Sequence, residues 1–152
     1  LKIPTDAIVQ DWQYWGCDSN WNAMKFQNPY YINKVSDSAY AKYLPTDMKQ
    51  MKVQGEPRLK SPEEMVKYVH KNDAHLMISI WASFGPWTEQ YRELKKMNAL
   101  LPFETWPRNS GVLPSDDFNP KARHLYWKYL THLYQMGIDA WRTASMRGWT
   151  SY

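Results

Sequence analysis

The stretch His75–Trp81 reads HLMISIW, an apolar run that ends in tryptophan and is followed by a turn-forming segment. Two shorter runs have the same form, Ala7–Trp12 (AIVQDW) and Gly137–Trp141 (GIDAW), and they lie at similar intervals along the chain. Short apolar strands that alternate with helical segments predict parallel β/α units, whose functional side chains follow the carboxyl ends of the strands. A closed barrel takes eight such units in about 250 residues, so this chain of 152 residues is predicted to form part of a barrel.

Helices are predicted between these strand-like runs. Ser61 is a suitable cap for a helix in which Pro62 takes the first position and Glu64 stands three residues after the cap. The resulting order of strands and helices requires parallel pairing through right-handed crossovers, with Ile8 and Val9 buried in the first strand. The remaining predicted elements are a helix from Trp87 to about Met97, a loop over Leu100–Phe118, a helix from Asn119 through Tyr134 and a stop at Gly137.

A long irregular stretch from Tyr14 to Lys60 is rich in aromatic residues. The whole chain contains nine tryptophans and eleven tyrosines, and aromatic residues make up 16% of it. A loop of this length is usually functional or disordered, and so many aromatic side chains argue against disorder. We favour an aromatic stacking surface over a tryptophan-rich core, because tryptophan and tyrosine suit positions that are apolar on one side and wet on the other.

Composition excludes several classes of partner and cofactor. The net charge of +4 comes from interleaved acids and bases, so nucleic acid is not a predicted partner. The single cysteine, Cys17, allows neither an internal disulfide nor a cysteine-based zinc site, and the histidines lack metal-ligand spacing, so no metal or cofactor is predicted. No stretch reaches the roughly 18 apolar residues of a membrane span. No signal peptide opens the chain, and its start at Leu1 reads like the interior of a longer protein.

Five segments carry patterns that occur together in one family: Ile3–Trp12, Trp21–Phe26, Pro62–His70, Ile78–Trp81 and Asp117–Arg123. In this order they resemble the catalytic barrel of glycoside hydrolase family 31, the retaining α-glucosidases and α-xylosidases. The sequence of the first segment and of the residues after it is most similar to bacterial α-xylosidases that trim xyloglucan fragments. The resemblance implies an α/β fold, a partial (β/α)8 TIM barrel of about three βα units that contain the barrel's second to fourth strands.

The resemblance also implies a sugar subsite. Asp11 ends the first predicted strand and would accept hydrogen bonds from a sugar hydroxyl, whereas the alternative is a structural acid that caps a loop. Trp81 matches the aromatic floor of the subsite at the end of the next strand. Trp12, Trp15 and Trp21 would line its rim or would pack within the loop.

The last strand-like segment departs from the family at the position of its nucleophile. The family uses an Asp directly after this strand, in a pattern such as W-x-T-D, and a second, acid/base Asp from a later strand. The matching residues here are Trp141, Arg142, Thr143 and Ala144, and a methyl group cannot attack an anomeric carbon. We assign Trp141 and Arg142 to the substrate site and assign no catalytic residue. Residues 1–143 are interpreted as a barrel fragment and 144–152 as a divergent tail, which a truncated or frame-shifted gene explains better than a deliberate knock-out or a natural non-catalytic homologue.

Three functions are compatible with these patterns. The first is a fragment of a glycosidase that cleaves terminal α-linked xylose or glucose from oligosaccharides by retaining double displacement, and that is inactive alone. The second is a non-catalytic module that binds a xyloglucan-type oligosaccharide or an α-glucoside. The third is an interaction protein that self-associates through open barrel edges, because an open sheet leaves backbone groups unpaired. The chain carries no sign of its location, although a periplasmic or secreted parent enzyme is plausible.

Overall fold

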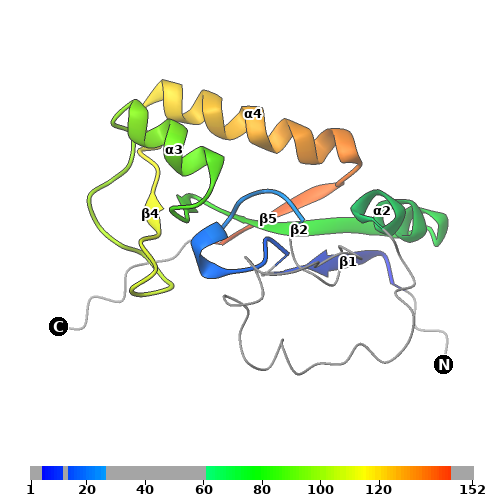
Figure 1. Cartoon of the computed structure of the whole chain (residues 1–152). Helices are drawn as coiled ribbons and strands as arrows, with labels where there is room; N and C mark the ends of the chain where they lie inside the picture. The colour runs from blue at the N-terminus through cyan, green and yellow to red at the C-terminus, as the bar shows by residue number, and fades with distance from the viewer. Residues whose placement is uncertain (1–4, 12–13, 27–60, 145–152) are drawn as a thin grey trace.

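A computed structural model of the chain describes residues 5–11, 14–26 and 61–144 (Figure 1). Its main sheet contains β1 (Ala7–Gln10), β2 (His75–Trp81) and β5 (Ala140–Ala144) in the order β1-β2-β5. Both pairs are parallel, with Ala7 opposite His75 and Ser79 opposite Arg142. The predicted partial barrel of parallel strands is therefore confirmed, and Figure 1 shows the three strands running side by side, with α4 above them on the β5 side.

The helices form where local signals predict them. In α2 (Pro62–Lys71), the Ser61 hydroxyl accepts a hydrogen bond from the Glu64 amide at 3.2 Å, and this cap satisfies a donor that has no partner within the helix. Thr88 and Asn119 cap the next two helices in the same way, and Gly137 ends the last one in the left-handed conformation, at φ 100°. These helices are α3 (Glu89–Lys96) and α4 (Pro120–Met136).

Two features differ from the sequence-based prediction. The third strand was expected over 138–141, whereas β5 begins at Ala140, because the Ile138 amide still donates to the Leu133 carbonyl at the end of α4, at 3.2 Å. The stretch predicted as loop contains β4 (Leu113–Pro114), which pairs antiparallel with β3 (Ser83–Phe84) directly after β2. Such two-residue strands leave no periodicity that a sequence pattern can reveal. A short 3₁₀ helix, η1 (Asp18–Asn20), follows β1.

The prediction that Ile8 and Val9 form a buried strand is wrong. Ile8 is 43% exposed and Val9 is 48% exposed, while Ile78 and Ile80 of β2 are almost completely buried. Among the described residues β1 has a neighbouring strand on one side only, whereas β2 has one on each side. An edge strand therefore lacks the neighbours that bury a central strand.

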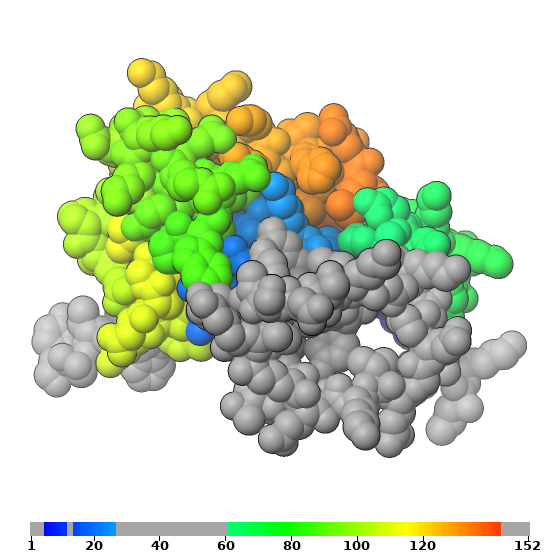
Figure 2. Space-filling view, in the orientation of Figure 1, coloured from blue at the N-terminus to red at the C-terminus, as the bar shows by residue number. Residues whose placement is uncertain are grey.

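The aromatic residues of segment 14–26 lie in the core rather than on a stacking surface, which corrects the prediction for this part of the chain. Trp15 and Trp21 are fully buried, and the Trp15 ring packs edge-on against Trp81 at a centroid distance of 5.0 Å and an interplanar angle of 88°. In Figure 2 this segment (blue) lies between α3 (green) and the C-terminal half of α4 (orange). The aromatic content thus supplies apolar area for a small core, in edge-to-face contacts that favour it further.

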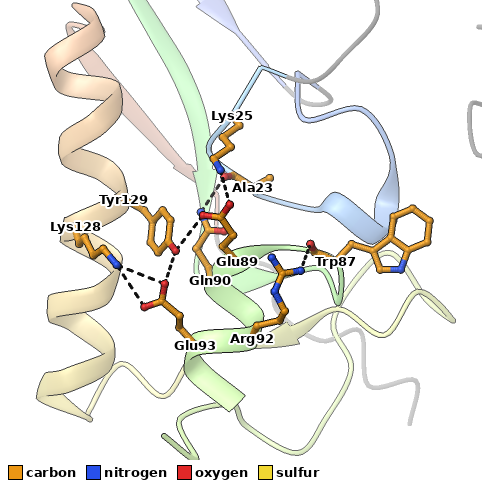
Figure 3. A network of polar contacts seen from close by, with 9 residues as sticks. All are labelled: Ala23, Lys25, Trp87, Glu89, Gln90, Arg92, Glu93, Lys128 and Tyr129. Atoms are coloured by element: carbon orange, nitrogen blue, oxygen red, sulfur yellow. Dashed lines mark hydrogen bonds and ion pairs between the residues drawn. The ribbon is translucent and has the colours of Figure 1, made fainter. Parts of the chain in front are cut away.

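Segment 14–26 is tied to α3 and α4 by the polar network of Figure 3. The buried Gln90 side chain donates to the Ala23 carbonyl at 2.8 Å, and Lys25 forms an ion pair with Glu89 at 2.8 Å. The hydrogen bond from Lys25 lowers the pKa of Glu89. Because the ion pair is about half exposed, we expect the buried Gln90 contact to contribute more to stability.

Asp139 connects β2 and α2 at the amino-terminal end of the sheet. Its carboxylate accepts hydrogen bonds from the Leu76 amide at 2.7 Å and from His70 Nε2 at 2.8 Å. Burial raises the pKa of Asp139, but these hydrogen bonds outweigh it, so that the net pKa is lowered. A carboxylate with a lowered folded pKa stabilises the fold at pH values above its unfolded pKa, and this contribution is lost as the pH falls through the folded pKa.

We expect Asp139→Asn to destabilise the chain by about 1–2 kcal/mol at pH 7, because hydrogen bonds to a charged acceptor are replaced by weaker neutral ones. The difference from wild type should shrink as the pH falls below the ordinary Asp pKa of about 3.9 towards the lowered pKa of the folded state, because the wild-type advantage depends on the charged carboxylate. Urea unfolding at pH 3 to 7 measures this. An unchanged difference across that range would show that the charge of Asp139 is not responsible.

Candidate functional site

A polar row crosses the sheet near the carboxyl ends of its strands. Asp11 directly follows β1, Ser79 lies in β2, and Arg142 lies in β5 opposite Ser79. The Ser79 hydroxyl donates to Asp11 Oδ1 at 2.5 Å, and Arg142 Nη1 donates to Asp11 Oδ2 at 2.8 Å. Residues in register on neighbouring strands share a face, so these three side chains lie together on one face of the sheet.

The three side chains differ in accessibility. Ser79 is fully buried, whereas the side chains of Asp11 and Arg142 are 44% and 52% exposed. The row therefore has a buried neutral donor beneath an accessible carboxylate and guanidinium. A carboxylate accepts hydrogen bonds and a guanidinium donates them. The exposed pair can therefore bind a ligand hydroxyl group both as a donor and as an acceptor.

Trp141 lies on the opposite face of the sheet. Successive side chains in a strand alternate between faces, so Trp141 and Arg142 point in opposite directions. Trp141 is paired with the buried Ile78 and packs against the hydrophobic core. With Trp127, Tyr126 and Thr143 it lines a cavity of about 560 Å³ between the sheet and α4. The structure thus brings Asp11 and Arg142 together, but it does not bring Trp141 to them.

Trp81 ends β2 beside this row. It is 5% exposed and packs against Trp15 and Trp21, and its backbone carbonyl accepts a hydrogen bond from Tyr126 at 3.0 Å. Its indole Nε1 is buried and has no hydrogen-bond partner among the described residues. Trp12 lies outside the described residues.

Ala144 is the last residue of β5 and is opposite Trp81 in the register. The position that matches the family's nucleophile therefore lies at the carboxyl end of a strand, two residues after Arg142. An Asp at this position would lie at the edge of the sheet where functional residues of parallel barrels gather.

Sequence reasoning did not assign two residues that shape the row. Ser79 was quoted only as part of an apolar strand, although a polar residue in the middle of such a run is a signal of a buried hydrogen bond. Tyr14 is fully buried and donates its hydroxyl to the Ser79 carbonyl at 3.1 Å. Burial is also the main cause that raises the pKa of Tyr14, which keeps this hydroxyl protonated as a donor.

Other chemistry has less support in the described ranges. No group of three or more His, Cys, Asp and Glu side chains there could hold a metal ion. The Cys17 thiol is buried, and burial raises its pKa, which disfavours the reactive thiolate. Residues 5–11, 14–26 and 61–144 contain no helix that is long and apolar enough to cross a membrane.

Parallel β/α units with a polar row at the carboxyl ends of their strands are part of a β/α barrel. Comparison with known proteins identifies the family to which this barrel belongs. Residues 1–146 match the family model described as the glycosyl hydrolases family 31 TIM-barrel domain. The chain therefore belongs to glycosyl hydrolase family 31. It is 34% identical over 145 residues to an α-xylosidase of Saccharolobus solfataricus, which covers 95% of this chain and 15% of that relative.

Solved structures agree on the fold. The α-xylosidase of this family from Xanthomonas citri is 28% identical with a TM-score of 0.63, and the match covers 91% of this chain and 13% of that one. An α-xylosidase from a soil metagenome, solved with xylose, is 18% identical with a TM-score of 0.66, covering 98% of this chain and 18% of that one. The chain thus spans less than a fifth of the length of these relatives.

Proposed function

We propose that this chain is the part of a retaining α-glycosidase barrel that holds the terminal sugar of an α-xyloside or α-glucoside. The observation that carries the proposal is the accessible Asp11 carboxylate, paired with Arg142 at the carboxyl edge of the parallel sheet. Two α-xylosidases that are 34% and 28% identical to the chain favour a terminal xylose over glucose. The name of a relative does not fix the sugar for this chain, so glucose stays an alternative.

A sugar at this edge would use charge-assisted hydrogen bonds. Its hydroxyl would donate to Asp11, and the Arg142 guanidinium would donate to an oxygen of the same sugar. Hydrogen bonds with one ionised partner are roughly twice as strong as neutral ones. Asp11 accepts hydrogen bonds from side chains of β2 and β5, which favours a place in the polar row over a structural acid that only caps a loop.

Retaining hydrolysis needs two carboxyl groups about 5–5.5 Å apart, one to attack the anomeric carbon and one to protonate the leaving oxygen. Ala144 supplies no carboxylate at the nucleophile position. Asp11 accepts hydrogen bonds from Ser79 and Arg142, and a single carboxyl group cannot fill both catalytic roles. We therefore propose that the chain alone binds without hydrolysis.

We expect no release of p-nitrophenol above the uncatalysed rate when the chain is incubated with p-nitrophenyl α-xyloside or α-glucoside. The α-xylosidase of S. solfataricus, assayed under the same conditions, is the positive control. Turnover together with a covalent glycosyl adduct on this chain would show that a carboxylate elsewhere in the chain acts as the nucleophile in place of position 144.

Binding of free xylose tests the proposed sugar site directly. Titration of the labelled chain with xylose should shift the NMR signals of the Asp11 and Arg142 side chains. The signals of Trp141, which lies on the opposite face of the sheet, should not change. Asp11→Asn removes the charge with little change of shape and should weaken binding. Shifts centred on Trp141 and Trp127 instead would move the sugar to the cavity beneath α4.

The exposed edge of the sheet supports self-association as a second candidate function. Ile8 and Val9 lie on the two faces of β1, are each more than 40% exposed, and belong to a strand that pairs on one side among the described residues. We expect the sedimentation coefficient to rise with concentration, and Val9→Lys to suppress the rise, because charge on an edge strand opposes pairing. A constant coefficient would remove this candidate.

A further inference from the structure

We propose that Ser79 is a positioning residue, which fixes the carboxylate of Asp11 and through it the guanidinium of Arg142. Its use at a sugar site rests on the proposed function, but the positioning itself is a property of the ligand-free chain. The inference comes from where its hydroxyl and its carbonyl make their hydrogen bonds.

Ser79 links the accessible carboxylate to the interior of the molecule. It is fully buried in β2, the central strand, and its hydroxyl donates to Asp11 Oδ1 at 2.5 Å. Asp11 itself lies just beyond β1, whose register with β2 ends at Gln10. The hydroxyl of Ser79 therefore holds a side chain that the sheet ladder does not reach.

Arg142 is less suited to this role. Its side chain is 52% exposed and has many rotamers, so holding it in one geometry costs conformational entropy, and exposed ion pairs contribute little. Serine has one side-chain torsion, and a fully buried hydroxyl has no water to exchange with. The order of dependence is therefore that Ser79 holds Asp11 and Asp11 holds Arg142.

Tyr14 holds Ser79 from the other side. The fully buried Tyr14 hydroxyl donates to the Ser79 carbonyl at 3.1 Å, which ties the tryptophan-rich segment 14–26 to the same residue of β2. The Tyr14 hydroxyl thus bonds the backbone of Ser79 and not its side-chain hydroxyl. It therefore offers a control that perturbs the backbone of Ser79 but leaves its hydroxyl in place.

Occupation of the two carboxylate oxygens limits what a ligand can use. Ser79 takes one lone pair of Oδ1, and Arg142 takes one of Oδ2. A carboxylate held in a constant orientation suits recognition of the hydroxyl groups of one sugar.

The test uses the whole 152-residue chain, labelled with ¹³C and ¹⁵N, without ligand. Three-bond couplings report whether Asp11 occupies one χ1 rotamer. We expect one rotamer in wild type, averaging in Ser79→Ala and a single rotamer again in Ser79→Thr, which keeps the hydroxyl. Tyr14→Phe should lower the urea midpoint but keep one rotamer. A purely structural Ser79 would not give this rescue by threonine.

Two results would overturn the positioning role: a single Asp11 rotamer in Ser79→Ala, or averaging that persists in folded Ser79→Thr. If Ser79→Ala does not fold, Asp11→Ala tests the same contact from the other side. The positioning role then requires that the Ser79 χ1 couplings and Cβ chemical shift change more in Asp11→Ala than in the control Arg142→Met. Unchanged Ser79 signals in Asp11→Ala would also overturn it.

Xylose binding separates this inference from the proposed function. If both hold, Ser79→Ala should weaken xylose binding about tenfold, which corresponds to about 1.4 kcal/mol, and Ser79→Thr should restore most of it. Absence of xylose binding in wild type would contradict the proposed function, while the ligand-free rotamer result would still decide the role of Ser79.

Discussion

Gly85→Ala is expected to destabilise the chain by about 3 kcal/mol or more, because the added methyl group has no space. A Cβ at this position would overlap the Ser19 carbonyl oxygen and would lie 2.6 Å from the Trp21 amide nitrogen. Both neighbours are backbone atoms. They are also held in place, since the Gly85 amide donates to the Trp21 carbonyl at 3.0 Å and the Trp87 amide donates to the Ser19 carbonyl at 2.9 Å.

Urea unfolding followed by tryptophan fluorescence measures the loss, with Gly111→Ala as the matched control. Gly111 has a positive φ of 72°, but the atoms nearest to a Cβ there belong to the Pro86 ring, the first at 3.5 Å, which is ordinary van der Waals contact. The control should therefore lose about 1–2 kcal/mol, the cost of a left-handed conformation. A loss for Gly85→Ala no larger than that of the control would mean that the close approach relaxes easily.

This close approach has consequences for the candidate site. Segment 14–26, which Gly85 contacts, supplies the tryptophans that bury Trp81 and the tyrosine that holds the Ser79 carbonyl. The polar row is thus supported from behind by a core of aromatic side chains. We expect variants that loosen this core to affect the site even where they do not touch Asp11 or Arg142.

Features encoded by near neighbours in the chain were predictable. Ser61 and Thr88 each accept a hydrogen bond from an amide three residues later, so the start of a helix is determined within one turn. The parallel pairing followed from the alternation of strands and helices, because hairpins cannot connect such strands. Resemblance to a family then gave the numbering of the units within a barrel.

Features that depend on distant contacts were not predictable. An aromatic residue suits a buried core as well as a stacking surface, and only the approach of segment 14–26 to β2 decided between them for Trp15 and Trp21. The exposure of Ile8 and Val9 likewise depends on what lies beside β1. Composition and periodicity contain no information on either point.

The resemblance to a family assigned Asp11 and Arg142 to one substrate site. They are 131 positions apart in the chain, yet they form an ion pair. That a sugar binds there stays a prediction. Trp141 was assigned to the same site, although the alternation of side chains along a strand separates it from Arg142. This alternation is visible in the sequence once both residues are placed in one strand.

The role of Asp11 in catalysis can be tested in a complete barrel. Residues 1–143 of this chain would replace the matching part of the S. solfataricus α-xylosidase, which then supplies position 144 and everything after it. In this chimera we expect Asp11→Ala to lower kcat/KM at least about 100-fold, which corresponds to about 2.7 kcal/mol of transition-state stabilisation. If the hydrogen bond strengthens in the transition state, kcat should fall together with kcat/KM.

The change in stability should be moderate. Removing an exposed ion pair typically costs up to about 1 kcal/mol, and leaving the buried Ser79 hydroxyl without its acceptor costs about 1–3 kcal/mol, so the melting temperature should fall by several degrees without loss of the fold. Asp139→Asn is the matched control, because Asp139 lies at the opposite end of the strands and contacts His70 and Leu76 instead. That variant should lower the melting temperature and leave kcat/KM nearly unchanged. The reverse pattern, with near-normal kinetics and large destabilisation in Asp11→Ala, would assign Asp11 a structural role and remove it from the sugar site.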